Sequence, residues 1–320
     1  MPLNLPAITN AADYARHFRS DVWQEAAEVI CERHNLSRTR VLRRSEQGEN
    51  LVFFVDERFV IKIFAPFRQN YLRERAALEA LGGTLDIQTP AVLYAGDIEG
   101  WSYLVMTQLA GIPAKEAWPG IDTRGRVEIA SHLGAALKGL HNHPASLSQA
   151  STNRDWREFI ERQAETCIER QRACGVNAGW LESLPAYVDA RPAMLSKERE
   201  PVLLHGDAHL GNLLLAREGG RWKISGLFDF GDSLRGFHEY DFVAPGVLMV
   251  QGSRELQRAM LLSYGYTESQ LDQSLRARLM LLTILYECSD LRKYALRLKP
   301  EALSFTLEEL EAAIWRFADD

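Results

Sequence analysis

Two short polar segments carry the side chains best suited to chemistry. One reads HGDAHLGN and contains Asp207 and Asn212, and the other reads FDFG and contains Asp229. Each follows an apolar, β-rich run, so each is predicted to be a loop that projects polar side chains from a rigid base. Two such loops lying side by side would bring these oxygen-bearing groups together.

These residue types match the needs of phosphoryl transfer from a nucleotide. Mg²⁺ neutralises crowded phosphate oxygens and prefers hard oxygen ligands, which the amide of Asn212 and the carboxylate of Asp229 provide. A second carboxylate that does not bind the metal is needed to orient the acceptor hydroxyl and to accept its proton. Asp207 is the candidate for that catalytic role.

A lysine lies inside an apolar run closer to the N-terminus. Lys62 occupies the middle of VIKIF, where its charge is costly without an anionic partner, and nucleotide phosphates would provide one. Taken alone, Lys62 is equally well explained as a surface lysine on an edge strand. Its position ahead of the two polar segments favours the phosphate-binding interpretation.

The polar segments resemble those of a known family. HGDAHLGN and DFGD are similar to the catalytic and metal-binding motifs of the aminoglycoside phosphotransferase and choline kinase superfamily, which has a protein-kinase-like fold. The spacing from the Asp to the Asn also equals that in the protein-kinase catalytic loop. The resemblance implies a catalytic base at Asp207, Mg²⁺ ligands at Asn212 and Asp229, and supporting roles for His205, His209 and Asp241.

The same resemblance assigns the nucleotide contacts. It pairs the strand lysine with a helix glutamate, Glu74, with Glu79 as the fallback. The segment VMTQLAG, which contains Gln108 and Leu109, is similar to the hinge whose backbone pairs with a purine edge, although a plain connector would have the same composition. The turn Ser45–Asn50 has only one glycine, so the choice between ATP and GTP stays open.

Hydrophobic patterning predicts the elements that position these residues. An amphipathic helix is expected within residues 12–34, and a helix at about Asn70–Leu81 is ended by two glycines. Strands are predicted at Thr39–Arg44, Leu51–Val55, Phe59–Phe64, Ala91–Ala95, Trp101–Thr107, Val202–Leu204, Leu213–Ala216 and Trp222–Phe228. Further helices are predicted at Thr123–His141, Asp155–Arg172, Thr267–Leu298 and Thr306–Phe317.

The predicted fold class is therefore α+β, a two-lobed protein-kinase-like fold with a small antiparallel sheet in one lobe and mainly helices in the other. We expect an N-terminal nucleotide-binding lobe over residues 1–110 and a helical catalytic and substrate-binding lobe over residues 111–320. The segment His141–His143 is expected to pack or to end a helix and not to bind a metal.

Composition narrows the classes of partner. The 37 basic and 43 acidic residues give a net charge of -6, which offers no reason to bind nucleic acid or an anionic membrane. The longest apolar stretches are too short to span a bilayer, and the first residues lack the pattern of a secretory signal, so a cytoplasmic location is expected. The four scattered cysteines are expected to be free thiols.

The expected partner is a small, cationic, hydroxyl-bearing acceptor, bound by a monomer or a dimer. Acidic side chains share one face of the predicted helix after Asp155 and could attract a polyamine, but a solvated face with ion pairs explains them as well. The leading prediction is phosphorylation of an aminoglycoside or similar polyhydroxylated amine, with a role in antibiotic resistance. The alternatives are a metabolite kinase acting on choline, homoserine, a sugar or a fructosamine, a nucleotide-binding pseudokinase, and a protein kinase.

Overall fold

The computed structural model describes residues 3–36, 42–46, 48–68, 70–144, 155–190 and 200–318. The chain divides into two compact units. The first unit comprises Met1–Thr84, Gln88–Ala110 and Phe228–Asp232, and the second comprises Leu85–Ile87, Gly111–Leu227 and Ser233–Asp320. The segment that contains Asp229 thus belongs to the first unit, although the chain on both sides of it belongs to the second.

The first unit is built on a five-stranded antiparallel sheet. In sequence order its strands are β1 (Leu42–Arg44), β2 (Leu51–Val55), β3 (Phe59–Ile63), β4 (Val92–Ile98) and β5 (Trp101–Thr107). In space they follow the order β1-β2-β3-β5-β4. The turn from β2 to β3 uses Asp56 and Glu57 with φ of 50° and 55°, and two left-handed residues in succession fit a tight hairpin. This hairpin sets the register that pairs Lys62 with Val52 on one side and Leu104 on the other.

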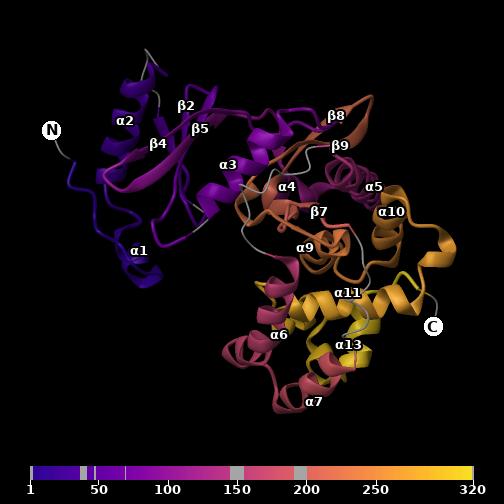
Figure 1. Cartoon of the computed structure of the whole chain (residues 1–320). Helices are drawn as coiled ribbons and strands as arrows, with labels where there is room; N and C mark the ends of the chain where they lie inside the picture. Colours follow the sequence, from indigo (N-terminus) through magenta and orange to yellow (C-terminus); the bar gives the residue numbers. More distant parts are fainter. Residues whose placement is uncertain are drawn as a thin grey trace. The chain divides into compact units, whose positions relative to one another are not determined.

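Two helices, α1 (Ala11–His17) and α2 (Val22–His34), precede the sheet, where the sequence predicted one helix within residues 12–34. The chain turns between them, and the indole of Trp23 donates to the carbonyl oxygen of His17 at 2.7 Å, which satisfies an acceptor at the end of α1. Figure 1 shows α2 lying against the sheet. Trp23 is fully buried there and packs edge-on against Trp101, with ring centroids 4.5 Å apart.

Helix α3 (Asn70–Leu81) also belongs to the first unit. It buries Glu74 together with the apolar side chains of Ala77, Leu78 and Leu81. Gly82 and Gly83 end it, with φ of 53° and 71°, as the sequence predicts. The helix therefore carries one buried carboxylate on an otherwise apolar face.

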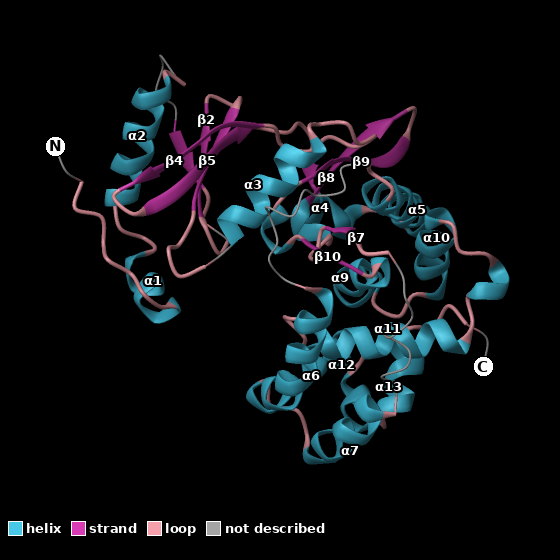
Figure 2. Cartoon of the chain, in the orientation of Figure 1, coloured by secondary structure: helices cyan, strands magenta, loops and turns pink. Residues whose placement is uncertain are grey.

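The second unit is mainly helical (Figure 2). Its helices are α4 (Ala114–Ala117), α5 (Thr123–His141), α6 (Trp156–Ala173), α7 (Ala178–Asp189), α9 (Val243–Pro245), α10 (Arg254–Tyr264), α11 (Gln273–Leu285), α12 (Leu291–Leu298) and α13 (Leu307–Ile314). A close contact joins α5 to α10, because a Cβ atom on Gly134 would clash with the backbone oxygen of Met260. Within the described part of the chain, no helix is both long and apolar enough to cross a bilayer.

Short strands interrupt these helices and carry the polar loops. They are β6 (Ile112–Pro113), β7 (Val202–Leu204), β8 (Leu213–Glu218), β9 (Arg221–Leu227) and β10 (Leu234–Gly236). Strand β7 pairs with β10, and β8 lies between β6 and β9. Short helical turns lie beside them: η1 (Trp118–Gly120), η2 (Leu210–Asn212), η3 (Phe230–Asp232), η4 (His238–Phe242), η5 (Gly246–Val250), η6 (Glu268–Gln270) and η7 (Pro300–Ser304).

The long helix predicted at Thr267–Leu298 is wrong. The chain forms η6, α11 and α12 instead, because Tyr286 at the end of α11 adopts an extended backbone with φ of −60° and ψ of 135°. Asp290 then caps α12 by accepting from the backbone N–H of Lys293 at 2.8 Å. The break sets the position of Tyr286.

The α+β fold class with a protein-kinase-like arrangement of elements is confirmed. The predicted strands at Leu51–Val55, Trp101–Thr107 and Val202–Leu204 and the helix at Thr123–His141 have the observed bounds. Residues 37–41, where the strand predicted at Thr39–Arg44 begins, lie outside the described residues. Patterning missed several elements of the second unit, among them β6, β10, α7 and α10.

Candidate active site

The loop that contains Asp207 follows β7 and is held by its backbone. The N–H groups of His205 and Gly206 donate to the carboxylate of Asp241 at 2.8 and 2.7 Å. Gly206 has φ of 86°, a left-handed conformation that glycine adopts without strain. Asp241, which lies in η4, therefore fixes the backbone immediately before Asp207.

Asp241 is itself held by a buried histidine. Its Oδ2 atom lies 2.9 Å from Nε2 of His141, whose Nδ1 lies 2.9 Å from the hydroxyl of Tyr264. Burial acts to raise the pKa of Asp241, but the hydrogen bond and charge of His141 and the other donors outweigh it, so this pKa lies below its ordinary value. Asp241 thus stays ionised and keeps both backbone hydrogen bonds. His141 packs within this network, and no cluster of three or more metal-binding side chains exists among the described residues.

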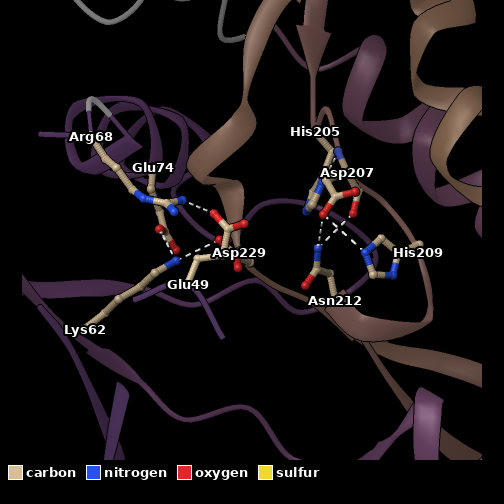
Figure 3. A network of polar contacts seen from close by, with 9 residues as sticks. All are labelled: Glu49, Lys62, Arg68, Glu74, His205, Asp207, His209, Asn212 and Asp229. Atoms are coloured by element: carbon tan, nitrogen blue, oxygen red, sulfur yellow. Dashed lines mark hydrogen bonds and ion pairs between the residues drawn. The ribbon is translucent and has the colours of Figure 1, made fainter. Parts of the chain in front are cut away.

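Three side chains hold the carboxylate of Asp207, and Figure 3 draws two of them, Asn212 and His209. The hydroxyl of Tyr286 donates to Oδ1 at 2.8 Å. On the other oxygen, Oδ2, the amide of Asn212 donates at 3.1 Å and Nε2 of His209 lies 3.2 Å away. The carboxylate is therefore fixed in rotation while its side chain keeps a quarter of its surface exposed, at 25%.

Both loop histidines use Nδ1 as an acceptor. The N–H of Gly211 donates to Nδ1 of His209 at 2.9 Å, and the N–H of Asp207 donates to Nδ1 of His205 at 3.2 Å. A neutral imidazole that accepts at Nδ1 carries its proton on Nε2. His209 can therefore donate from Nε2 to Asp207, whereas His205 is fully buried and shapes the turn.

Asn212 is oriented in a way that suits a cation ligand. Its Nδ2 group donates both to the backbone oxygen of Asp207, at 2.8 Å, and to the Asp207 carboxylate. These bonds turn the amide so that its carbonyl oxygen, Oδ1, is the atom available to a hard metal ion. The donor set in this loop fits the predicted Mg²⁺ ligand.

A second cluster lies within the first unit and joins Lys62, Glu74 and Asp229 (Figure 3). The ammonium of Lys62 lies 2.5 Å from Oε2 of Glu74 and 2.7 Å from Oδ1 of Asp229. The Lys62 and Glu74 side chains are almost completely buried, whereas the side chain of Asp229 is 44% exposed. Strand β3, helix α3 and the segment after β9 each contribute one member. Glu79, the fallback partner, instead forms an exposed ion pair with Arg75 on the same helix.

Electrostatics explain how this cluster is balanced. Burial alone would lower the pKa of Lys62, but the charges of Asp229 and Glu74 raise it above its ordinary value. Burial raises the pKa of Glu74 to about 7, although the Lys62 ammonium acts against this shift. Two carboxylates against one ammonium make the three-residue cluster net negative when all are ionised. Such a cluster suits a divalent cation at its exposed member, Asp229.

The backbone of Asp229 is unusual. It has φ of 65°, in the left-handed region that few residues other than glycine adopt and that aspartate tolerates better than most. Backbone outliers of this kind are concentrated at functional sites, where the surrounding structure holds them in place. Here the conformation directs the carboxylate towards Lys62.

The predicted hinge and the turn Ser45–Asn50 are less distinctive than these two clusters. The backbone N–H of Gln108 donates to the carbonyl oxygen of Arg58 at 2.9 Å, so this amide is already used, and Leu109 is half-buried. In the turn Ser45–Asn50, Gln47 lies outside the described residues, and Glu49 forms an ion pair with Arg68 (Figure 3). The purine-binding role of the hinge stays a prediction.

Sequence reasoning missed two residues of the second-unit network, Tyr286 and Tyr264. Tyr286 was placed inside a predicted continuous helix, so nothing directed it towards Asp207. A readable signal was present in the sequence Cys288-Ser289-Asp290, because Asp before an apolar-periodic run is a helix N-cap signal. The helix start at Leu291 implies a break just before it.

Comparisons with known proteins identify a family and a shared fold. Residues 40–280 match the model of a phosphotransferase enzyme family, whereas no curated protein matches the sequence. Wild-type aminoglycoside 2'-phosphotransferase-IIIa, solved as its GDP complex, is 15% identical, with a TM-score of 0.67 over 92% of this chain and 98% of that one. The streptomycin–ATP ternary complex of APH(2")-IIa is 21% identical, with a TM-score of 0.57 over 88% and 97% of the two chains. APH(3'')-Id from Streptomyces rimosus, with ADP and streptomycin, is 20% identical, with a TM-score of 0.58 over 82% and 98%.

At these identities, the likeness to solved structures shows a shared fold. The family match shows membership in the family, because residues 40–280 make up most of the chain. They include both polar segments and the strand lysine. The fold and the motif order are those of the aminoglycoside phosphotransferase and choline kinase superfamily. The chain belongs to the phosphotransferase enzyme family.

Proposed function

We propose that this protein is a small-molecule kinase that transfers the γ-phosphoryl group of ATP or GTP to a hydroxyl group. The observation that carries the proposal is the environment of Asp207. Its carboxylate is partly exposed and accepts hydrogen bonds from three side chains. Asn212, whose amide suits a metal ion, follows five positions later. A carboxylate held in this way can orient an acceptor hydroxyl.

The chemistry divides between the two groups of residues. Lys62, held by Glu74, would contact the nucleotide phosphates, and the hinge segment with Gln108 and Leu109 would pair with the purine edge. Asn212 and Asp229 would hold Mg²⁺, and the bound ion would neutralise charge on the phosphate oxygens. Several solved neighbours are complexes with GDP, ADP or ATP, which supports a nucleotide co-substrate.

Asp207 acts on the acceptor. It accepts a hydrogen bond from the hydroxyl, whose oxygen attacks the γ-phosphorus while the bond to the β-phosphate oxygen breaks. The hydroxyl proton passes to the carboxylate, and the nucleoside diphosphate leaves. Because the transition state for phosphoryl transfer is loose, most of the rate enhancement comes from positioning and charge stabilisation. His205, His209 and Asp241 keep the loop in shape for this step.

The acceptor we propose is an aminoglycoside or a similar polyhydroxylated amine. The net charge of -6 tolerates a cationic substrate, and acidic residues on α6, among them Glu158, Glu161 and Glu165, are exposed. Solved neighbours include complexes with streptomycin, gentamicin and kanamycin. A metabolite alcohol such as choline, homoserine, a sugar or a fructosamine is the alternative, since a shared fold does not fix the acceptor. A resistance role in the cytoplasm would follow from the first choice.

A panel assay tests the proposal. The purified protein is incubated with Mg²⁺, with ATP or GTP, and with each acceptor in turn: streptomycin, kanamycin, gentamicin, choline, homoserine and a fructosamine. A mass gain of about 80 Da, one phosphoryl group, on an aminoglycoside is expected, and it should disappear with Asp207→Asn. A gain only on a metabolite alcohol would move the acceptor to the alternative class, and nucleotide binding without any transfer would favour a pseudokinase.

A further inference from the structure

The hydrogen bond between Tyr286 and Asp207 joins residues far apart in the chain and is made by a buried tyrosine. Tyr286 is only 4% exposed, and its hydroxyl donates to Oδ1 of Asp207 at 2.8 Å. Its ring packs near that of Tyr240, with centroids 5.5 Å apart. A buried tyrosine hydroxyl needs a partner, and here that partner is the candidate catalytic carboxylate.

The short turn η4 positions Tyr286 through successive residues. Glu239 accepts a bidentate pair of hydrogen bonds from Arg278 of α11, with both Nε–Oε2 and Nη2–Oε1 at 3.0 Å. The next residue, Tyr240, accepts at its hydroxyl from the backbone N–H of Glu287 at 3.1 Å. These two contacts join η4 to the first half of α11 and to the residue after Tyr286.

The third residue in this run is Asp241, which holds the backbone of the catalytic loop at His205 and Gly206. One turn therefore fixes both partners of the Tyr286–Asp207 bond: the loop that carries the carboxylate and the segment that carries the hydroxyl. A bond supported from both ends by one element is a positioning device and not a chance surface contact.

We propose that Tyr286 is a positioning residue for the phosphoryl transfer, which selects one rotamer of the Asp207 carboxylate and so orients this group for the acceptor hydroxyl. The inference rests on the proposed function. Without the hydroxyl of Tyr286, Oδ1 loses its donor, and the carboxylate is held only at Oδ2 by Asn212 and His209.

The hydroxyl of Tyr286 is suited to act as a hydrogen-bond donor at every neutral pH. Burial, together with the adjacent charge of Asp207, raises the pKa of Tyr286 well above its ordinary value. The hydroxyl therefore keeps its proton and donates throughout the neutral pH range, so that it cannot take the acceptor proton itself. Its contribution is orientation alone.

Tyr286→Phe tests the proposal because it removes one oxygen atom and keeps the buried ring. We expect kcat to fall by about tenfold to a hundredfold, the effect of losing one hydrogen bond to a charged group, with KM for nucleotide and acceptor changed less than about threefold. Turnover is measured with the fastest acceptor of the panel and also with water, as nucleotide hydrolysis.

Tyr294→Phe is the matched control. Tyr294 is also buried, at 3% exposure, and its hydroxyl donates to the backbone oxygen of Cys288 at 3.3 Å, close in sequence to Tyr286 but away from the carboxylate. This variant should keep the wild-type kcat. Thermal unfolding of both variants shows whether either is simply misfolded.

A double-mutant cycle separates positioning from general packing. In an Asp207→Ala background, Tyr286→Phe should lower the residual rate no further, since the tyrosine acts through the carboxylate. A wild-type kcat in Tyr286→Phe, or the same loss in the presence and absence of Asp207, would overturn the proposal while leaving the proposed function intact. A wild-type protein that neither phosphorylates a panel acceptor nor hydrolyses nucleotide would overturn both.

Discussion

At the scale of single residues, Lys62 is held by two ion pairs that the sequence predicted only in part. The buried ammonium of Lys62 was recognisable because a lysine inside an apolar strand needs an anion. Its two carboxylate partners come from helix α3 and from a segment distant in the sequence, and only the resemblance suggested Glu74. The link between Asp229 and Lys62 could not be predicted from periodicity, because it depends on where the chain returns after β9.

Asp241 provides the pH prediction at the residue scale. Its folded-state pKa lies below the ordinary value, so its stabilisation is complete above the unfolded pKa, about 3.9, and is lost as the pH falls through the lower folded value. Asp241→Asn should cost about 2–4 kcal/mol of unfolding free energy at about pH 7, since two backbone donors and His141 lose a charged acceptor.

Urea unfolding at about pH 7, 5 and 3.5 checks this dependence. The difference between the wild type and Asp241→Asn should stay constant from about pH 7 to 5 and should narrow below about pH 4. A difference that grows as the pH falls, or one that is absent at neutral pH, would show that the carboxylate charge does not hold the loop.

At the scale of elements, periodicity predicted regular segments well and their interruptions badly. Strands such as Leu51–Val55 were predictable because β-branched and aromatic residues are enriched in them and turn-like segments bound them. The predicted helix Thr267–Leu298 continued through Tyr286 because apolar residues recur at helical spacing on both sides of the break. The extended backbone at Tyr286 ends α11, and the N-cap at Asp290 starts α12. Hydrophobic periodicity averaged over many residues does not detect such local helix ends.

Two glycines on helix α5 give a matched prediction at this scale. A Cβ atom at Gly134 would clash with the backbone of α10 at Met260, whereas one at Gly139 would meet no atom within 4 Å. Gly134→Ala should therefore destabilise the protein by about 2–4 kcal/mol, because backbone cannot move aside as a flexible side chain can. Gly139→Ala should stabilise it by about 0.5–1 kcal/mol, through the better helix propensity of alanine.

Thermal unfolding of the two alanine variants provides the measurement. Opposite shifts of the melting temperature are expected, downward for Gly134→Ala and upward for Gly139→Ala. Equal shifts in the same direction would mean that helix propensity alone, and not the close approach of α5 to α10, sets the response.

At the scale of the whole molecule, the sequence allowed us to predict the fold class and the order of the motifs. It predicted the division into two units only approximately. The change of character near Gly111 marks one place where the chain passes from the first unit to the second. The assignment of Phe228–Asp232 to the first unit was not foreseeable, because a five-residue segment between strands has no hydrophobic signature of its own. That segment brings Asp229 to Lys62.

The most direct test of the central claim is the stoichiometry of the reaction with an acceptor from the panel. We predict that one nucleoside diphosphate forms for each acceptor molecule that gains about 80 Da, that the reaction requires Mg²⁺, and that Asp207→Asn lowers it by at least about a hundredfold while the variant still binds nucleotide. Transfer at the wild-type rate by Asp207→Asn would contradict the assignment of the base. Nucleotide consumption without a phosphorylated acceptor would contradict the claim that this protein is a small-molecule kinase.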